Sequence, residues 1–99
     1  MAQLIWTDTA VRWLEDIFQY VAADNPAAAT AVMEGILKRA ELAAEFPAIG
    51  SLLRKVDEGE VRVALYGHYR LPYLYRQDAS AIEILGVFHG AMDMERYLP

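Results

Sequence analysis

The side chains best suited to chemistry are basic, and more than half of them lie between positions 51 and 76. In that segment five Arg and Lys residues stand against three Asp and Glu residues, an excess of two positive charges. Such cations could hold a phosphate group, but this excess is small for a nucleic-acid backbone. Over the whole chain, 9 basic residues face 14 acidic ones, and the net charge of −5 has the wrong sign for general binding to phosphates. We therefore expect no direct contact with nucleic acid.

Metal and thiol chemistry find no support in the sequence. The chain has no cysteine, which excludes disulfides, thiolate zinc sites and a catalytic thiol. Its two histidines, His68 and His89, are 21 positions apart without an obvious third ligand, so we predict no metal site and no cofactor. His68 is interpreted as a turn residue. His89 ends an apolar segment and is interpreted first as a hydrogen-bonded structural histidine.

Length and hydropathy favour a single soluble domain. The chain has 99 residues against the roughly 150 typical of one domain, so we expect residues 1–99 to form one domain. No segment approaches the ~18 consecutive apolar residues that a membrane helix needs, and the amino terminus lacks a basic segment followed by an apolar stretch. We therefore expect a cytoplasmic protein that contacts no membrane.

The first half of the chain has the spacing of two amphipathic helices. Thr7-Asp8-Thr9 supplies capping hydroxyls and a carboxylate, so a helix is predicted to begin there. Apolar residues recur at helical spacing until Asp24-Asn25-Pro26, which ends this helix and begins a second, with Asn25 as the cap. The second helix is predicted to reach about Glu45, before Phe46-Pro47 ends it. The two helices form a hairpin.

The second half has the alternating pattern of strands, with turn signals about every 10 residues. Strands are predicted at 53–56, 61–66, 69–76 and 81–89, turns at 57–59, 67–68 and 77–80, and a short helix in the tail 90–98. The turn at 57–59 is predicted to be three residues long, with Gly59 at positive φ. The segment 81–89 is apolar at both parities and is expected inside the sheet. Pro72 lacks an N–H for a sheet ladder, so we expect a local disruption there.

These elements predict an α+β fold. A short apolar segment at 4–6 forms an N-terminal strand, and the two-helix hairpin packs on one face of a small antiparallel sheet. If the turn Gly67-His68 is two residues long, Arg62 lies on the face opposite to Arg70, whereas a three-residue turn reverses this result. Either arginine could instead be a solvated strand residue or bind a carboxylate such as Glu60 or Glu83.

The chain has more aromatic residues than so small a core can easily enclose. There are 11 of them. Trp13 and Tyr20 are seven residues apart, hence on nearly the same side of the first helix and beside its apolar stripe. Their first interpretation is core, and the alternative is a partly exposed patch that binds a partner. In the tail, Met92 and Tyr97 belong either to a frayed end or to a segment that contacts a target.

Several short motifs follow one another along the chain. They are Trp6-Thr7-Asp8-Thr9-Ala10, Tyr20 followed by Asp24-Asn25-Pro26, Phe46-Pro47-Ala48-Ile49-Gly50, Arg62, Tyr69-Arg70 and Val87-Phe88-His89. Together with the order of the predicted elements, they resemble the RelE/ParE superfamily of bacterial toxins over nearly the whole chain, and the ParE branch more than the RelE branch. The resemblance implies a toxin of a type II toxin–antitoxin system, neutralised by a cognate antitoxin in a hetero-oligomer.

The resemblance leaves two mechanisms open. ParE-like members inhibit DNA gyrase, whereas RelE-like members cut messenger RNA on the ribosome with a cluster of Arg and Lys on the sheet. For cleavage this chain offers Arg62, Arg70 and His89, but Met92 stands where many relatives carry a basic residue. We therefore predict a gyrase-binding inhibitor with no catalytic residue, and keep a ribosome-dependent nuclease and a homologue that has lost toxicity as alternatives. Partner contacts are predicted at Trp13, Tyr20, Arg62, Arg70, Met92 and Tyr97.

An antitoxin has two physically available ways to cover such a toxin. It can lay an amphipathic helix in an apolar groove, and it can add a strand at an open sheet edge. We expect both modes in the same complex. Because the toxin is acidic, we expect the binding segment of the antitoxin to be neutral or basic along its contact face.

Overall fold

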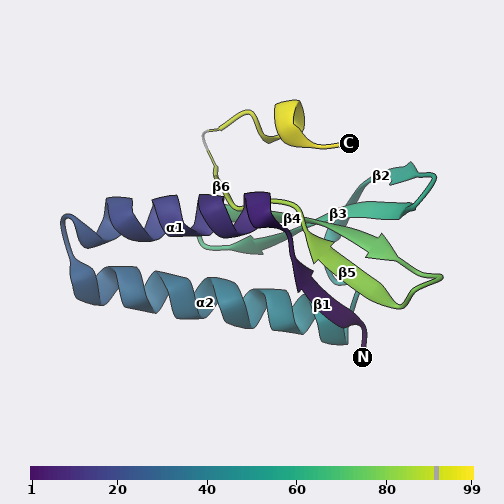
Figure 1. The fold of residues 1–99 in the computed structure, drawn as a ribbon, viewed down its shortest axis with the longest axis horizontal. Helices are drawn as coiled ribbons and strands as arrows, with labels where there is room; N and C mark the ends of the chain where they lie inside the picture. Colours follow the sequence, from purple (N-terminus) through teal and green to yellow (C-terminus); the bar gives the residue numbers. More distant parts are fainter. Residues whose placement is uncertain (91) are drawn as a thin grey trace.

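Figure 1 shows the order of the elements in the computed structural model, which describes residues 1–90 and 92–99. The elements are β1 (Gln3–Trp6), α1 (Asp8–Ala22), α2 (Pro26–Glu45), β2 (Ser51–Val56), β3 (Gly59–Tyr66), β4 (Tyr69–Arg76), β5 (Ala81–Ile84), β6 (Phe88–His89) and the 3-10 helix η1 (Met94–Tyr97). Position 91, inside the predicted tail, lies outside the described residues. The predicted α+β fold, a two-helix hairpin on a sheet, is confirmed.

Both helices begin at the residues that the sequence marks. The Thr7 hydroxyl accepts a hydrogen bond from the Ala10 N–H at 3.1 Å and donates one to the Ile84 carbonyl at 2.8 Å. The Asn25 side chain accepts a hydrogen bond from the Ala28 N–H at 3.1 Å. Thr7 therefore caps α1 and also fixes the start of this helix against β5.

We expect Thr7→Ala to lower the free energy of unfolding by about 1–2 kcal/mol, because a helix cap and a helix-to-sheet hydrogen bond are lost together. Thr7→Ser is the matched control, since it keeps the hydroxyl and loses only a methyl group. Urea unfolding of the wild type and the two variants measures the difference. A Ser variant as unstable as the Ala variant would show that the hydroxyl does not have this role.

The sheet is mixed rather than purely antiparallel. The strand order is β1-β5-β4-β3-β2, and β6 pairs with the beginning of β4. All neighbouring strands are antiparallel except β1, which runs parallel to β5. The helical hairpin follows β1 in the chain, so no hairpin turn sets the direction of this strand. The turn signals of the sequence therefore could not show that the sheet is mixed.

The predicted strand 81–89 is wrong in its continuity, because residues 85–87 interrupt it. Its first part, β5, lies inside the sheet between β1 and β4, as expected. At the interruption, residues 85–87 stand opposite the two residues 71–72 of β4. This is the place of Pro72, whose missing N–H indicated a disruption. On the side of β4 that faces β5 and β6, the Pro72 carbonyl accepts a hydrogen bond from the Leu85 N–H at 2.9 Å.

The interruption decides which way the side chains of β6 point. With one extra residue in the loop, Phe88 pairs with Arg70, and His89 pairs with Tyr69. An unbroken strand would have placed Phe88 opposite Tyr69 instead, because a shift of one residue exchanges the two faces of a strand.

The turn between β3 and β4 settles the register that the sequence left open. Tyr66 pairs with Tyr69, so the turn is two residues long, and Gly67 has a φ of 56°. Arg62 and Arg70 consequently lie on opposite faces of the sheet.

The turn between β2 and β3 is two residues long, not three as predicted. Val56 pairs directly with Gly59. The predicted positive φ of Gly59 is confirmed at 153°. A Cβ atom at this position would lie 2.0 Å from the Tyr75 carbonyl oxygen, so only glycine fits.

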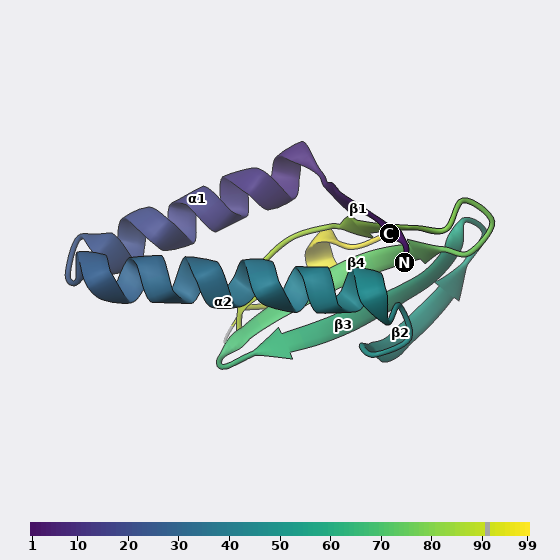
Figure 2. The same ribbon diagram turned by 90° about the horizontal axis from the view of Figure 1, so that it is seen from below.

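The main core lies between the helical hairpin and one face of the sheet, and Figure 2 shows α2 crossing β3 and β4. Buried members include Leu14, Ile36, Ala40, Leu71, Tyr73 and Ile82. Residues 92–99, called the C-terminal segment below, cross the opposite face of the sheet. There Glu95 accepts a hydrogen bond from Arg54 at 2.6 Å. In the part of the chain that the structure describes, no helix has the length and apolar character needed to cross a bilayer.

Candidate functional site

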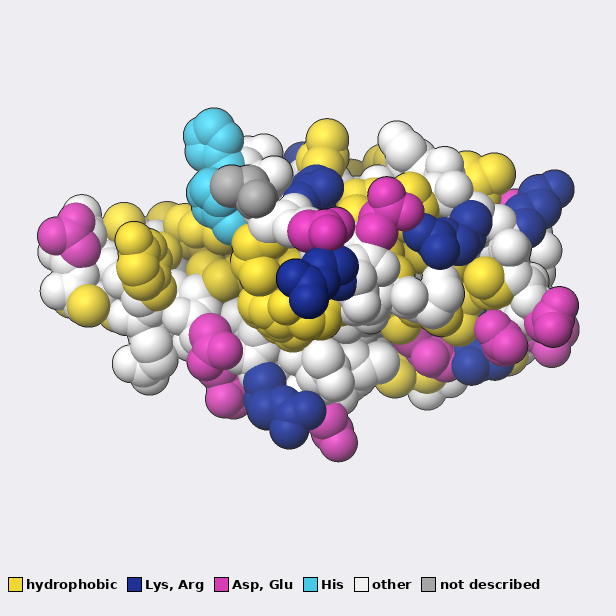
Figure 3. All heavy atoms as spheres, turned by 90° about the horizontal axis from the view of Figure 1, so that it is seen from above, with side chains coloured by type: hydrophobic (Ala, Val, Ile, Leu, Met, Phe, Trp, Pro, Cys, Tyr) yellow, Lys and Arg dark blue, Asp and Glu magenta, His cyan; other side chains and the backbone are white. Residues whose placement is uncertain are grey.

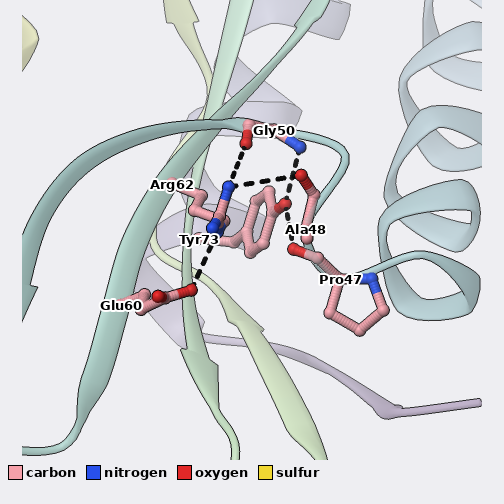
Figure 4. Close-up of polar contacts among 6 residues, drawn as sticks. All are labelled: Pro47, Ala48, Gly50, Glu60, Arg62 and Tyr73. Atoms are coloured by element: carbon pink, nitrogen blue, oxygen red, sulfur yellow. Dashed lines mark hydrogen bonds and ion pairs between the residues drawn. The ribbon is translucent and has the colours of Figure 1, made fainter.

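The guanidinium group of Arg62 is held by a carboxylate and by two backbone carbonyls of the same chain (Figure 4). Its Nε donates to Glu60 Oε1 at 2.9 Å, and its Nη1 donates to the carbonyl oxygens of Gly50 at 2.7 Å and Ala48 at 3.2 Å. The side chains of Arg62 and Glu60 are only 16% and 15% exposed. Of the interpretations weighed from the sequence, carboxylate binding is confirmed for this arginine, which also anchors the loop between α2 and β2.

The Tyr73 hydroxyl anchors the same loop. It accepts a hydrogen bond from the Gly50 N–H at 3.0 Å and donates one to the Pro47 carbonyl at 2.6 Å. Burial raises the pKa of Tyr73 above its usual 10.0, although the bond from Gly50 and the charge of Arg62 oppose this shift. The hydroxyl therefore stays protonated at neutral pH and acts as a structural group.

Arg70, on the opposite face, contacts the C-terminal segment. Its Nη2 donates to the carbonyl oxygen of Met92 at 2.5 Å and to that of Gly90 at 3.4 Å. Glu83, considered as a partner for Arg70, instead accepts a hydrogen bond from Arg76 Nε at 2.6 Å. Arg70 thus positions the chain after β6.

We expect Arg70→Ala to speed amide hydrogen exchange in the segment after β6, because the side chain that holds two of its carbonyls is gone. Arg76→Ala is the matched control, since it removes an arginine of the same strand whose side chain binds Glu83 and not the described carbonyls after β6. Exchange measured by mass spectrometry on peptides from 90–99 makes the comparison. Equal exchange in both variants would contradict the anchoring role of Arg70.

The three residues of the nuclease alternative do not meet at one site. Arg62 and Arg70 lie on opposite faces. His89 is exposed, with its ring centroid 5.9 Å from that of Tyr69 and 6.3 Å from that of His68. On the face that carries the C-terminal segment, Lys and Arg side chains alternate with Asp and Glu side chains (Figure 3). Within residues 1–90 and 92–99, no three His, Asp or Glu side chains stand together as metal ligands.

A groove of about 510 Å³ opens between α1 and the end of the sheet where β4 begins. Its described lining consists of Trp13, Asp16, Ile17, Tyr20, Tyr69, Val87, His89 and Met92. Three of the predicted partner-contact residues, Trp13, Tyr20 and Met92, therefore line one site. Tyr20 is 84% exposed, as the patch alternative expected. Figure 3 shows the histidines next to apolar side chains on this side of the molecule.

An aromatic cluster holds one wall of this groove in place. The Trp13 ring centroid is 4.8 Å from that of Phe88 and 5.5 Å from that of Tyr97. The Phe88 and Tyr97 rings stack at 5.6 Å. Tyr97, a predicted partner contact, thus joins η1 to α1 beside the groove.

Sequence reasoning missed several residues of the groove. Asp16 and Ile17 follow Trp13 at i+3 and i+4, and Tyr20 follows it at i+7, so this wall was visible as a second stripe on the first helix. The opposite wall, with Tyr69 and Val87, depends on the interruption of the predicted strand 81–89, for which the sequence indicated only a disruption at Pro72.

Comparisons with known proteins agree with this architecture. A family model described as the ParE toxin of the type II toxin–antitoxin system parDE matches residues 4–94. One similar solved structure is the chromosomal ParDE toxin–antitoxin system from P. aeruginosa, with 22% identity, a TM-score of 0.63, and coverage of 90% of this chain and 96% of that chain. Another is the toxin–antitoxin complex RelBE2 from Mycobacterium tuberculosis, with 27% identity, a TM-score of 0.59, and coverage of 89% and 96%. No curated protein matches. The chain belongs to the ParE toxins of type II toxin–antitoxin systems, within the RelE/ParE superfamily.

Proposed function

We propose that this toxin inhibits DNA gyrase by binding it in the cytoplasm, and that it catalyses no reaction. The observation that carries the proposal is the placement of the cations. Arg62 is bound to Glu60 and to backbone carbonyls, and Arg70 lies on the other face of the sheet. Cleavage of RNA needs a base, an acid and several cations around one phosphate. The chain has the shape and family of a ParE toxin without such an assembly among its described residues.

Binding alone is enough to stop an enzyme that works through large conformational changes. A ligand that binds one state of gyrase 100-fold more tightly than the others favours that state by about 2.7 kcal/mol. Inhibition then requires a complementary surface and no reacting group. The groove between α1 and the sheet supports this proposal, because it offers a hollowed and largely apolar surface for a partner.

We also propose that a cognate antitoxin forms a hetero-oligomer with this chain. The two similar solved structures described above are a ParDE toxin–antitoxin system and a RelBE2 toxin–antitoxin complex. The strand β2 lies at the edge of the sheet and can accept an added strand, which matches one of the two docking modes predicted from the sequence. This mode suits an antitoxin segment that orders on binding, because main-chain hydrogen bonds need little side-chain complementarity.

Two assays with purified protein test the mechanism. The protein is added to gyrase in a supercoiling reaction and, separately, to a bacterial translation extract that contains one defined messenger RNA. The proposal expects a loss of supercoiling and an intact messenger RNA. Cleaved codons with normal supercoiling would overturn it in favour of a ribosome-dependent nuclease. No effect in either assay would overturn it in favour of a homologue without toxicity.

A further inference from the structure

The helix α1 carries more apolar surface than its own packing uses. Ala10 and Leu14 are buried in the main core. A second stripe, with Trp13, Ile17 and Tyr20, lines the groove, and its first two members also pack against the edge of the core. The outer end of this stripe is open to solvent, because the Tyr20 side chain is 84% exposed. An aromatic residue so placed contributes little to folding and is typical of a contact residue in an interface.

The groove is formed before any partner arrives. Trp13 is packed against Phe88 and Tyr97, and Tyr69 pairs with His89 across two strands. A preformed hollow accepts a protruding element of a folded protein without a further cost of ordering its own walls. The groove can therefore receive a protruding element of a folded target, and the edge of β2 stays available to a segment that orders on binding.

The charge of the groove indicates the chemistry of what it binds. Asp16 is the single acidic side chain among the described lining residues, and no Lys or Arg is among them. The whole toxin is acidic, with a net charge of −5. An enzyme that holds DNA needs basic surfaces to do so. The carboxylate of Asp16 and a basic surface of gyrase are therefore complementary.

We infer that this groove is the surface that contacts gyrase, with apolar side chains of the enzyme seated between Trp13 and Tyr69 and a Lys or Arg beside Asp16. The inference rests on the proposed function and adds to it the place and the chemistry of the contact. It assigns Tyr20 as an apolar contact and Asp16 as the charge that selects a basic partner.

The measured quantity is the concentration of toxin that inhibits gyrase supercoiling by half. Tyr20→Ala and Asp16→Lys are expected to raise the amount of toxin needed by about tenfold or more, as for contacts at the centre of an interface. Two controls are matched to them: Phe46→Ala truncates an aromatic side chain that is 54% exposed outside the groove, and Glu15→Lys reverses a neighbouring charge on α1. Both controls are expected to inhibit like the wild type. Because Tyr20 and Asp16 are exposed, thermal unfolding should show all four variants folded.

The outcomes separate the inference from the function on which it rests. If the wild type inhibits gyrase and both groove variants inhibit equally well, the groove is not the contact surface and the proposed function still stands. If the groove variants inhibit gyrase normally but escape the antitoxin, the groove belongs to the antitoxin and the inference is wrong. If the wild type does not inhibit gyrase, the proposed function fails, and the inference fails with it.

Discussion

Tyr73→Ala is expected to lower the free energy of unfolding by about 3–5 kcal/mol, as for other large core side chains cut back to alanine. The ring of Tyr73 is fully buried in the main core, and its hydroxyl holds Pro47 and Gly50. Tyr73→Phe keeps the ring and leaves a buried N–H and a carbonyl without their partner, for a loss of about 1–3 kcal/mol. Urea unfolding measures both, with Tyr20→Ala as the exposed control, expected within about 0.5 kcal/mol of the wild type.

The contribution of Tyr73 should also depend on pH. Burial raises the pKa of Tyr73 in the folded protein, whereas in the unfolded chain the group ionises near 10. Above pH 10 the unfolded state has released a proton that the folded state still holds, so the free energy of unfolding falls as the pH rises. Below pH 10 the contribution of Tyr73 to this free energy is fully present. The difference in stability between the wild type and Tyr73→Phe should therefore shrink above pH 10. A difference that stays constant through this range would contradict the burial of the hydroxyl.

Arg62→Ala is expected to lower the free energy of unfolding by about 2–3 kcal/mol, somewhat less than the 3–5 kcal/mol of fully buried ion pairs, because both partners keep some exposure. The substitution leaves Glu60 without its cation and removes two hydrogen bonds to the loop after α2. The double variant with Glu60→Ala should lose less than the sum of the two single variants, since they share one interaction.

The same variant separates a structural arginine from a catalytic one. If Arg62 anchors the loop, toxicity should fall only as far as the folded fraction falls, and a lower growth temperature should restore it. A variant that is as stable as the wild type but no longer toxic would contradict this interpretation. It would place Arg62 at the contact with the target or at a reacting site instead.

Local chemistry in the sequence predicted most of the elements. Thr7 and Asn25 mark the starts of the helices because their side chains satisfy N–H groups at the first turn. Gly67 marks a tight turn, and Pro72 marks the break in the ladder on one side of β4. These signals act over a few residues, so a sequence shows them directly.

The remaining features depend on contacts between distant segments. The direction of β1 is set by its pairing with β5, which lies beyond both helices. The face on which His89 lies is set by the loop 85–87, where one extra residue reverses the alternation. The arrangement of Trp13 with Phe88 and Tyr97 needs the C-terminal segment to cross the sheet. One wall of the groove was therefore readable from helical spacing, and the other was not.

The stoichiometry of inhibition is the most direct test of the claim that this toxin acts by binding. Gyrase is held at a fixed concentration, well above the dissociation constant of the complex, and titrated with toxin while supercoiling is followed. A binding inhibitor should remove activity in proportion to the toxin added and reach completion at a fixed molar ratio to gyrase. Complete inhibition by far fewer toxin molecules than gyrase molecules would require turnover, and it would contradict the account.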